Sequence, residues 1–158
     1  MVNSEREKWD QLPELYVRLH KDELGYPPKE WEQLRAEPTE RPNIYRIKSI
    51  PFYARGIGLE DEVFAGSSPE GYFPVFVKVV KRSGFSTMRI SMQAQEDRPR
   101  ITEDFTRRGA SLEFLGRLVA IAIPRSAFDE VSEYICGGKE KGLWDAEDGF
   151  LIIDDPDN

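Results

Sequence analysis

The sequence predicts an α+β fold in which an antiparallel, barrel-like β part is followed by a split β-α-β part of the ferredoxin-like type. Three observations predict it. Short alternating runs of apolar and polar residues, separated by glycine and proline, fill residues 14–92 and are typical of small barrels. Two helical patterns occur within residues 93–151. Strand patterns stand before, between and after these two helices, which is the element order of a split β-α-β unit.

We expect a single domain over residues 14–151. Residues 1–13 are polar and charged, and they predict an N-terminal extension with a short helix that Pro13 interrupts. Residues 152–158 predict an acidic tail. The 158 residues are enough to bury a core without disulfides or bound metals.

The first two strands are expected at residues 14–20 and 30–37. The second run, EWEQLRAE, is also compatible with a helix, and we interpret it as a strand because the next run pairs easily with it. In ELYVRLH the apolar residues Leu15, Val17 and Leu19 occupy every second position, which is the period of a strand. The GYPP segment between the two runs is a connection, because two prolines exclude a helix interior there.

Four more strands are expected at residues 44–50, 62–65, 73–81 and 86–92, where β-branched or alternating residues dominate. The last two runs are separated by a short segment that contains Gly84, which predicts a hairpin. The alternation of the last run points its methionines and isoleucine inward. It points the residues between them outward, namely Thr87, Arg89 and Ser91.

The segment KRSGFST between those two strands raises the question of a phosphate-binding loop. Such a loop needs more glycines and a helix directly after them, whereas a strand pattern follows here. We therefore interpret the segment as a turn. The alternative is that its basic and hydroxyl side chains contact a partner, namely Arg82, Ser83, Ser86 and Thr87.

The first helix of the second part is expected at ITEDFTRRGA, with Thr102 as its N-terminal cap and Gly109 at its end. The stretch SLEFLGRLVAIAIP then predicts one strand, or two strands around Gly116. Ala120 and Ala122 leave little bulk on one face of this stretch, so we expect a helix to pack closely there.

The second helix is expected at SAFDEVSEYICGG, with Ser126 as its cap and the two glycines at its end. Its apolar stripe consists of Phe128, Val131, Tyr134 and Ile135. The run LWDAEDGFLII predicts the last strand.

Composition and charge exclude several functions. The net charge of −7 disfavours binding to nucleic acid or anionic lipid. No apolar run approaches the length of about 18 residues that a transmembrane helix needs, and the charged start does not resemble a secretory signal. With one cysteine, no internal disulfide forms. These features together predict a cytoplasmic protein.

The charge is spread unevenly along the chain. Residues 126–158 hold 2 basic and 10 acidic side chains, a net charge of −8, whereas residues 78–125 hold 10 basic and 5 acidic ones, a net charge of +5. The basic middle either neutralises the acidic end within the fold or contacts a partner. The first interpretation is favoured, since charged side chains mostly occupy the solvated surface.

Residues that could carry catalysis do not form a recognisable pattern. His20 is the only histidine and cannot by itself form a zinc site or a catalytic triad signature. Cys136 lies near the end of an amphipathic helix, where a buried, inert thiol is expected. We therefore expect no enzyme activity, no cofactor and no metal.

Two acidic clusters leave metal binding open as an alternative. One holds Asp145, Glu147 and Asp148, and the other holds Glu60, Asp61 and Glu62. Carboxylate oxygens suit divalent cations, but neither spacing matches a calcium-binding loop. Solvated turns are the favoured interpretation of both clusters.

Several stretches together resemble a known family. The stretches are GYPPKEWEQLRAEP, IPFYARGIGLEDEV, VVKRSGFSTMRI, GRLVAIAIP and GGKEKGLWDAEDGFL. The most specific sequence phrases within them are R-S-G-x-S-T-x-R and I-P-F-x-A-x-G, and the remaining stretches add weaker support. Over residues 14–151 the chain is similar to the small bacterial proteins of domain of unknown function family 4265. The resemblance implies a compact bacterial cytosolic protein, and it implies no reaction, cofactor or catalytic residue.

The leading hypothesis is an immunity protein that neutralises a basic toxin domain by covering its active site. An acidic inhibitor attracts a basic toxin and speeds the association. Its expected contact residues lie in the acidic C-terminal third, namely Asp145, Glu147, Asp148, Asp154, Asp155 and Trp144, and Trp9 and Trp31 are further candidate anchors. The alternatives are an enzyme with an acidic pocket that uses His20, and an RNA-associated regulatory module that uses Phe85.

Overall fold

The computed structural model describes residues 7–155. The chain folds into two compact units. Unit 1 comprises the residues up to Ser49 together with Glu60–Ser83, and unit 2 comprises Ile50–Leu59 together with the residues from Gly84 onward. The segment Ile50–Leu59 therefore belongs to unit 2, although the strands on both sides of it belong to unit 1. Among the described residues, no helix has the length and apolar character needed to cross a membrane.

Unit 1 is a curled sheet of five strands. They are β1 (Glu14–Arg18), β2 (Trp31–Pro38), β3 (Ile44–Ile47), β4 (Glu62–Ser67) and β5 (Pro74–Lys81). Consecutive strands pair antiparallel in chain order. A single parallel pair, Tyr16 opposite Val75, brings β5 back to β1, so the barrel-like sheet meets itself over one residue pair. The predicted strands and the barrel-like character of this part are confirmed.

The alternation that predicted these strands forms the core of unit 1. In β1, β2 and β4 every second side chain is buried, and the buried apolar residues of the sheet are Leu15, Val17, Leu34, Ala36, Ile44, Ile47, Val63 and Ala65. Such alternation is expected where one face of an antiparallel sheet packs inward.

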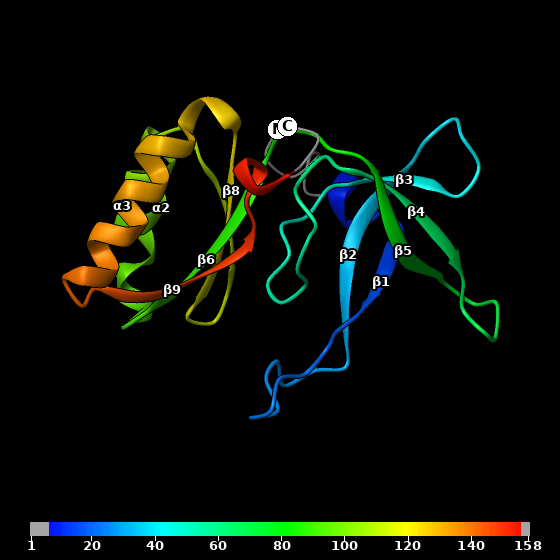
Figure 1. Ribbon diagram of the computed structural model, residues 1–158, viewed down its shortest axis with the longest axis horizontal. Helices are drawn as coiled ribbons and strands as arrows, with labels where there is room; N and C mark the ends of the chain where they lie inside the picture. The colour runs from blue at the N-terminus through cyan, green and yellow to red at the C-terminus, as the bar shows by residue number, and fades with distance from the viewer. Residues whose placement is uncertain (1–6, 156–158) are drawn as a thin grey trace. The chain divides into compact units, whose positions relative to one another are not determined.

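Unit 2 is the split β-α-β part. Its elements are β6 (Ser86–Met92), α2 (Arg98–Arg107), β7 (Ser111–Leu115), β8 (Leu118–Ile123), α3 (Phe128–Glu140) and β9 (Trp144–Phe150). The four strands form an antiparallel sheet in the order β7-β8-β6-β9, so β7 and β9 are edge strands. Figure 1 shows α2 and α3 on the same face of this sheet. The ferredoxin-like prediction is confirmed.

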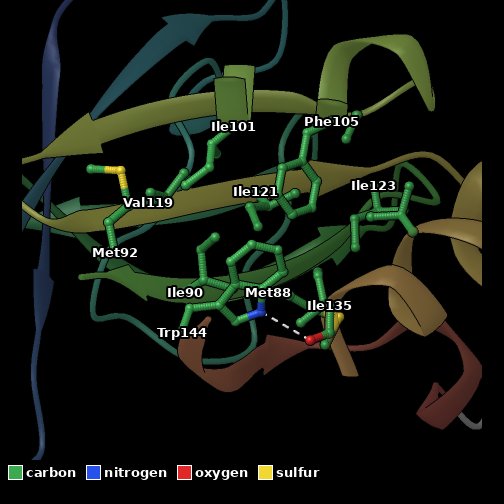
Figure 2. Close-up of a cluster of buried hydrophobic side chains, with 12 residues drawn as sticks. Met88, Ile90, Met92, Ile101, Phe105, Val119, Ile121, Ile123, Ile135 and Trp144 are labelled. Carbon is green, nitrogen blue, oxygen red and sulfur yellow. Dashed lines mark hydrogen bonds between the residues drawn. The ribbon is translucent and has the colours of Figure 1, made fainter. Parts of the chain in front are cut away.

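The helices and the sheet of unit 2 enclose one apolar core (Figure 2). It contains Met88, Ile90, Met92, Ile101, Phe105, Ala110, Val119, Ile121, Ile123, Val131, Ile135 and Trp144. The indole N–H of Trp144 donates a hydrogen bond to the carbonyl oxygen of Ile135 at 2.9 Å, which satisfies the one polar atom of that buried ring. The predicted apolar stripe of the second helix is confirmed.

The predicted hairpin between residues 73–81 and 86–92 is wrong. β5 pairs with β4 and β1 in unit 1, whereas β6 pairs with β8 and β9 in unit 2. The segment that contains Gly84 therefore joins two sheets. A glycine between two strand patterns indicates a change of direction, but it does not say which strands then pair.

The helix caps were also mispredicted. Thr102 lies inside α2, where its hydroxyl donates to the carbonyl oxygen of Arg98, four residues earlier. α2 begins at Arg98, four residues before Thr102. Pro99 is compatible with this start, because the first N–H groups of a helix have no partner within the helix and a missing N–H costs nothing there. Ser126 lies in a 3-10 turn that precedes α3, and the cap position of α3 is Ala127.

Candidate functional site on strand β9 and the 50–59 segment

The face of the unit 2 sheet that is opposite the helices is covered by residues 50–59, which we call the strap. Ile50, Ala120 and Ala122 form a small buried cluster, and Phe52, Leu59 and Phe85 pack against it. The small side chains of the alanines leave room for the strap. The prediction that a helix packs on these alanines is wrong, since a non-helical segment from a distant part of the chain fills that space.

Arg89 on β6 holds the strap in place. Its side chain is 1% exposed, and its Nε donates to the Glu147 carboxylate at 2.8 Å. Its two terminal nitrogens donate to three strap carbonyl oxygens, those of Pro51 (2.9 Å), Ala54 (3.0 Å) and Tyr53 (3.2 Å). A guanidinium presents its donors in a rigid planar fork, so it can bind several carbonyl groups at once.

The surroundings of Arg89 are built for this contact. A Cβ atom added to Gly149 would lie 2.9 Å from an Arg89 terminal nitrogen, so glycine leaves the space that the guanidinium occupies. The Gly56 N–H donates to the Gly149 carbonyl oxygen at 3.0 Å, and the Thr87 hydroxyl donates to the Ile57 carbonyl oxygen at 3.0 Å. Backbone and side-chain bonds therefore fasten both halves of the strap.

Thr87 and Arg89 point away from the helix-side core that holds Met88, Ile90 and Met92, as the alternation predicted, but the strap buries both of them, and of the predicted outward set only Ser91 is exposed. Alternation within a strand cannot show that both faces of a sheet are covered. The sequence feature that corresponds to this contact is the pair of phrases that carried the family resemblance: Arg89 is the last residue of R-S-G-x-S-T-x-R, and its strap acceptors lie within I-P-F-x-A-x-G.

The expected contact residues on β9 divide into three groups. Asp145 and Asp148 are exposed. Glu147 is half-buried and binds Arg89, with its other oxygen 3.8 Å from Arg55. Trp144 is 3% exposed in the core, so its ring is not available to a partner as an anchor.

Arg55 brings a positive charge to this acidic strand. It extends from the strap with its side chain 70% exposed, and it donates to the backbone carbonyl oxygen of Asp148 at 3.4 Å. In the strand register Asp145 stands opposite Ser91 and Asp148 opposite Met88, so their exposed side chains project from the two sides of the edge strand β9, and Arg55 lies beside Glu147, which is between them in sequence. We call these three residues the β9 surface.

The acidic tail continues from β9. Ile152 is buried, and its backbone N–H donates to the Ser86 hydroxyl at 2.9 Å. Asp154 is exposed and Asp155 is half-buried. Asp157 lies outside the described residues, as do residues 1–6 of the predicted N-terminal extension.

The two other candidate anchors are the remaining tryptophans. Trp9 is 37% exposed, its indole N–H donates to the Lys48 carbonyl oxygen, and Arg35 stacks on its ring at 5.1 Å. Trp31 is half-buried under Arg18. Both tryptophan rings therefore already have partners within unit 1.

The isolated nucleophile candidates do not form a site. His20 is exposed after the end of β1. Cys136 is exposed, so the prediction of a buried thiol is wrong: the buried side of α3 is defined by Val131, Ile135 and Gly138, and Cys136 points elsewhere. Within residues 7–155, no group of three or more His, Cys, Asp and Glu side chains is arranged to hold a metal ion.

Comparisons with known proteins place the chain in a family. The sequence profile described as Domain of unknown function (DUF4265) matches residues 32–146, well over half of the chain. The chain belongs to the DUF4265 family. The suspected resemblance to family 4265 is thereby confirmed.

One solved structure is similar in fold to this DUF4265 protein. It is described as a novel crystal structure of a hypothetical protein from Neisseria gonorrhoeae, and it covers 89% of this chain and 96% of its own with a TM-score of 0.71. The two sequences are 16% identical, so the likeness concerns the fold alone. A search of the curated proteins found no match.

Proposed function

We propose that this DUF4265 protein acts by binding a basic protein partner through the β9 surface. The observation that carries the proposal is the pair of exposed carboxylates, Asp145 and Asp148, on the edge strand β9. The hydrogen bond from Arg89 on β6 to Glu147 on β9 holds this strand in place. A surface on a braced strand loses little conformational entropy when it binds. The strap adds the exposed guanidinium of Arg55, which lies 3.8 Å from the Glu147 carboxylate and donates to the backbone carbonyl oxygen of Asp148.

The partner that suits this surface best is a secreted toxin domain, which makes the protein a bacterial immunity protein acting in the cytosol. The support is electrostatic. Residues 126–158 carry 2 basic and 10 acidic side chains, and an acidic surface of this kind attracts a basic protein and raises its association rate. Neutralisation then follows from occlusion of the toxin's active site and needs no chemistry in the inhibitor.

The energy of such a contact depends on a few anchors. A standard interface buries about 1,600 Å² in total, and its energy is concentrated in buried aromatic and arginine side chains. Because Trp144 is in the core, the anchor role passes to Arg55. Asp145 and Asp148 then act mainly as rim charges, which govern the association rate and its salt dependence.

The test is a charge reversal with a matched control. The double variant Asp145→Lys, Asp148→Lys is compared with Glu23→Lys, Glu70→Lys, which changes the net charge equally at two exposed positions of unit 1. A tagged chain is used to isolate the partner from the native host, and the partner gene is then induced with each variant. We expect the wild-type and control chains to protect the cells, and the β9 double variant to lose protection.

Three outcomes contradict the proposal. In the first, the isolated partner is not a toxic protein. In the second, the β9 double variant protects the cells as well as the wild type does. In the third, both double variants lose protection equally. The last outcome attributes the effect to net charge and not to the β9 surface. The association rate measured at two salt concentrations provides a second readout, which should fall with salt for the wild type and the control.

A further inference from the structure

Unit 1 contains a charged cavity that is separate from the β9 surface. Its volume is about 110 Å³, and it is lined by Arg46, Glu60, Glu62, Lys81, Arg82 and Ser83. We propose that this cavity binds a small oxyanion of the phosphate or carboxylate type. The proposal goes beyond the partner binding described above and rests on different residues.

A buried carboxylate positions one side of the cavity. Asp61 is fully buried, and its two oxygens accept hydrogen bonds from the Arg82 guanidinium at 3.0 Å and the Ser83 backbone N–H at 2.8 Å. A buried carboxylate is stable only when it is paired and hydrogen-bonded in this way. The arginine and serine of the family-specific R-S-G phrase are therefore held at the cavity wall.

Each carboxylate at the cavity already has a cation. Glu62 pairs with Arg46 at 3.3 Å, Glu60 pairs with Lys48 at 2.6 Å, and Asp61 pairs with Arg82 at 3.0 Å. The two acidic lining residues are thus neutralised by neighbouring side chains. A metal cation would have to displace these partners, which disfavours the metal-binding alternative for this cluster.

Lys81 is the cation left over. It is exposed at the end of β5, and within the described part of the chain its ammonium makes no ion pair. It stands opposite Glu62 in the strand register, yet the Glu62 carboxylate is bonded to Arg46. Of the six lining residues, Arg46, Lys81 and Arg82 are positive and Glu60 and Glu62 are negative, and Arg46 also lies 3.9 Å from Glu37. Lys81 is therefore the lining cation whose charge an oxyanion would balance.

The size of the cavity limits the ligand. A cavity of 150 Å³ accommodates a benzene molecule, and sites for drug-sized ligands are about 300 Å³ or larger. A volume of about 110 Å³ thus fits one phosphate or carboxylate group, and the rest of a larger ligand such as a nucleotide would lie outside the cavity. Guanidinium and ammonium groups, which Arg46, Arg82 and Lys81 supply, are the side chains that bind such anions most strongly.

The experiment is an NMR titration of the full chain with inorganic phosphate, and in a second arm with acetate, at constant ionic strength maintained by chloride. Lys81→Gln is compared with Lys78→Gln, which removes the same charge from an exposed position on the same strand. We expect saturable shifts of the Ser83 and Arg82 amide signals. We expect Lys81→Gln to weaken binding about tenfold and Lys78→Gln to change it less than about twofold.

The two arms distinguish the ligand source. Stronger binding of phosphate identifies a phosphate-type ligand, and stronger binding of acetate identifies a carboxylate such as a peptide terminus; either result supports the oxyanion site. The proposal is overturned if no saturable shift occurs at Ser83, or if the two variants weaken binding equally. Neither result bears on the β9 surface, which is tested in unit 2.

Discussion

Two adjacent glycines of α3 differ in what surrounds them. A Cβ atom added to Gly138 would lie 2.1 Å from the Trp144 ring, whereas one added to Gly137 would meet no atom within 4 Å. Gly138 therefore lets the indole approach the helix closely, as its burial at the end of α3 shows. Gly137 lacks any such role, and in a helix glycine costs up to about 1 kcal/mol relative to alanine.

We predict that alanine at these two positions changes stability in opposite directions. Gly138→Ala should destabilise the protein by at least about 2 kcal/mol, because the added methyl group displaces the indole and its hydrogen bond to Ile135. Gly137→Ala should stabilise it by about 0.5 kcal/mol. Urea unfolding of the two variants measures both values, and two effects of the same sign would show that the close approach is not needed.

Tyr134 is a residue whose protonation is coupled to folding. Burial, and then the hydrogen bond that its hydroxyl donates to Asp104 at 2.9 Å, raise its pKa above 10.0. The folded chain therefore keeps this proton to a higher pH than the unfolded chain does. The stabilisation is complete below pH 10.0 and is lost as the pH rises through the folded-state pKa.

We predict that Tyr134→Phe removes this alkaline dependence. The free energy of unfolding of the wild type should exceed that of the variant below pH 10.0, and the difference should shrink as the pH rises beyond that value. Urea unfolding at a series of pH values provides the measurement. A difference that is constant with pH would show that the hydroxyl has the same pKa in both states.

At the scale of elements, the strap depends on one side chain. Arg89 makes four hydrogen bonds from a nearly fully buried position, and three of their acceptors are strap carbonyl groups. Lysine retains the charge but not the planar fork, so it cannot reach these acceptors together. Hydrogen bonds to charged groups contribute about 1.5–3 kcal/mol each, and an unsatisfied buried charge costs more.

We predict that Arg89→Lys destabilises the protein by about 2–4 kcal/mol and loosens the strap first. In hydrogen exchange, the Gly56 amide, which donates to Gly149, should exchange faster relative to amides in α3. Arg100→Lys is the control, since that side chain is half exposed and its ion pair within residues 7–155 is the one with Asp97 at 3.5 Å. Equal effects of the two substitutions would contradict the role assigned to Arg89.

These elements also show how much the sequence could predict. Alternation and helical periodicity identified the strands of both units and the buried stripe of α3, because burial on one face imposes a period on the sequence. The strap escaped prediction, because a segment without periodicity covers Ala120 and Ala122 from about seventy positions earlier in the chain. Long-range contacts of this kind depend on tertiary packing and leave no local pattern.

The candidate site shows the same limit at the residue level. The acidic positions of β9 were visible in the sequence, and Asp145 and Asp148 are exposed as expected of charged residues. The burial of Arg89 was not visible, because a single sequence does not show whether the second face of a strand is covered. Trp144 lies in the core on the helix side, where a tryptophan at the start of an edge strand could equally have been an exposed anchor. Arg55 joins the surface only because the strap brings it to β9.

At the scale of the whole molecule, the chain passes between the two units three times. It leaves unit 1 at the strap, returns to it at Glu60, and leaves it again after Ser83. Unit 2 is therefore not one continuous stretch of sequence. Its C-terminal part, from Gly84 onward, contains the complete four-stranded sheet and both helices, but it lacks the segment that supplies the Arg89 acceptors and covers Ala120 and Ala122.

We predict that residues 84–158 expressed alone do not form a stable fold. Without the strap, the Arg89 guanidinium loses three of its acceptors, and the apolar surface around Ala120 and Ala122 is exposed to water. A peptide of residues 50–59 added in excess should raise the stability of the fragment by mass action, and the same peptide with Phe52→Ser should raise it less. Urea unfolding followed by circular dichroism measures each case. If the fragment alone unfolds at the same urea concentration as unit 2 in the full chain, the strap does not contribute to the stability of unit 2. The role given to Arg89 would then be wrong.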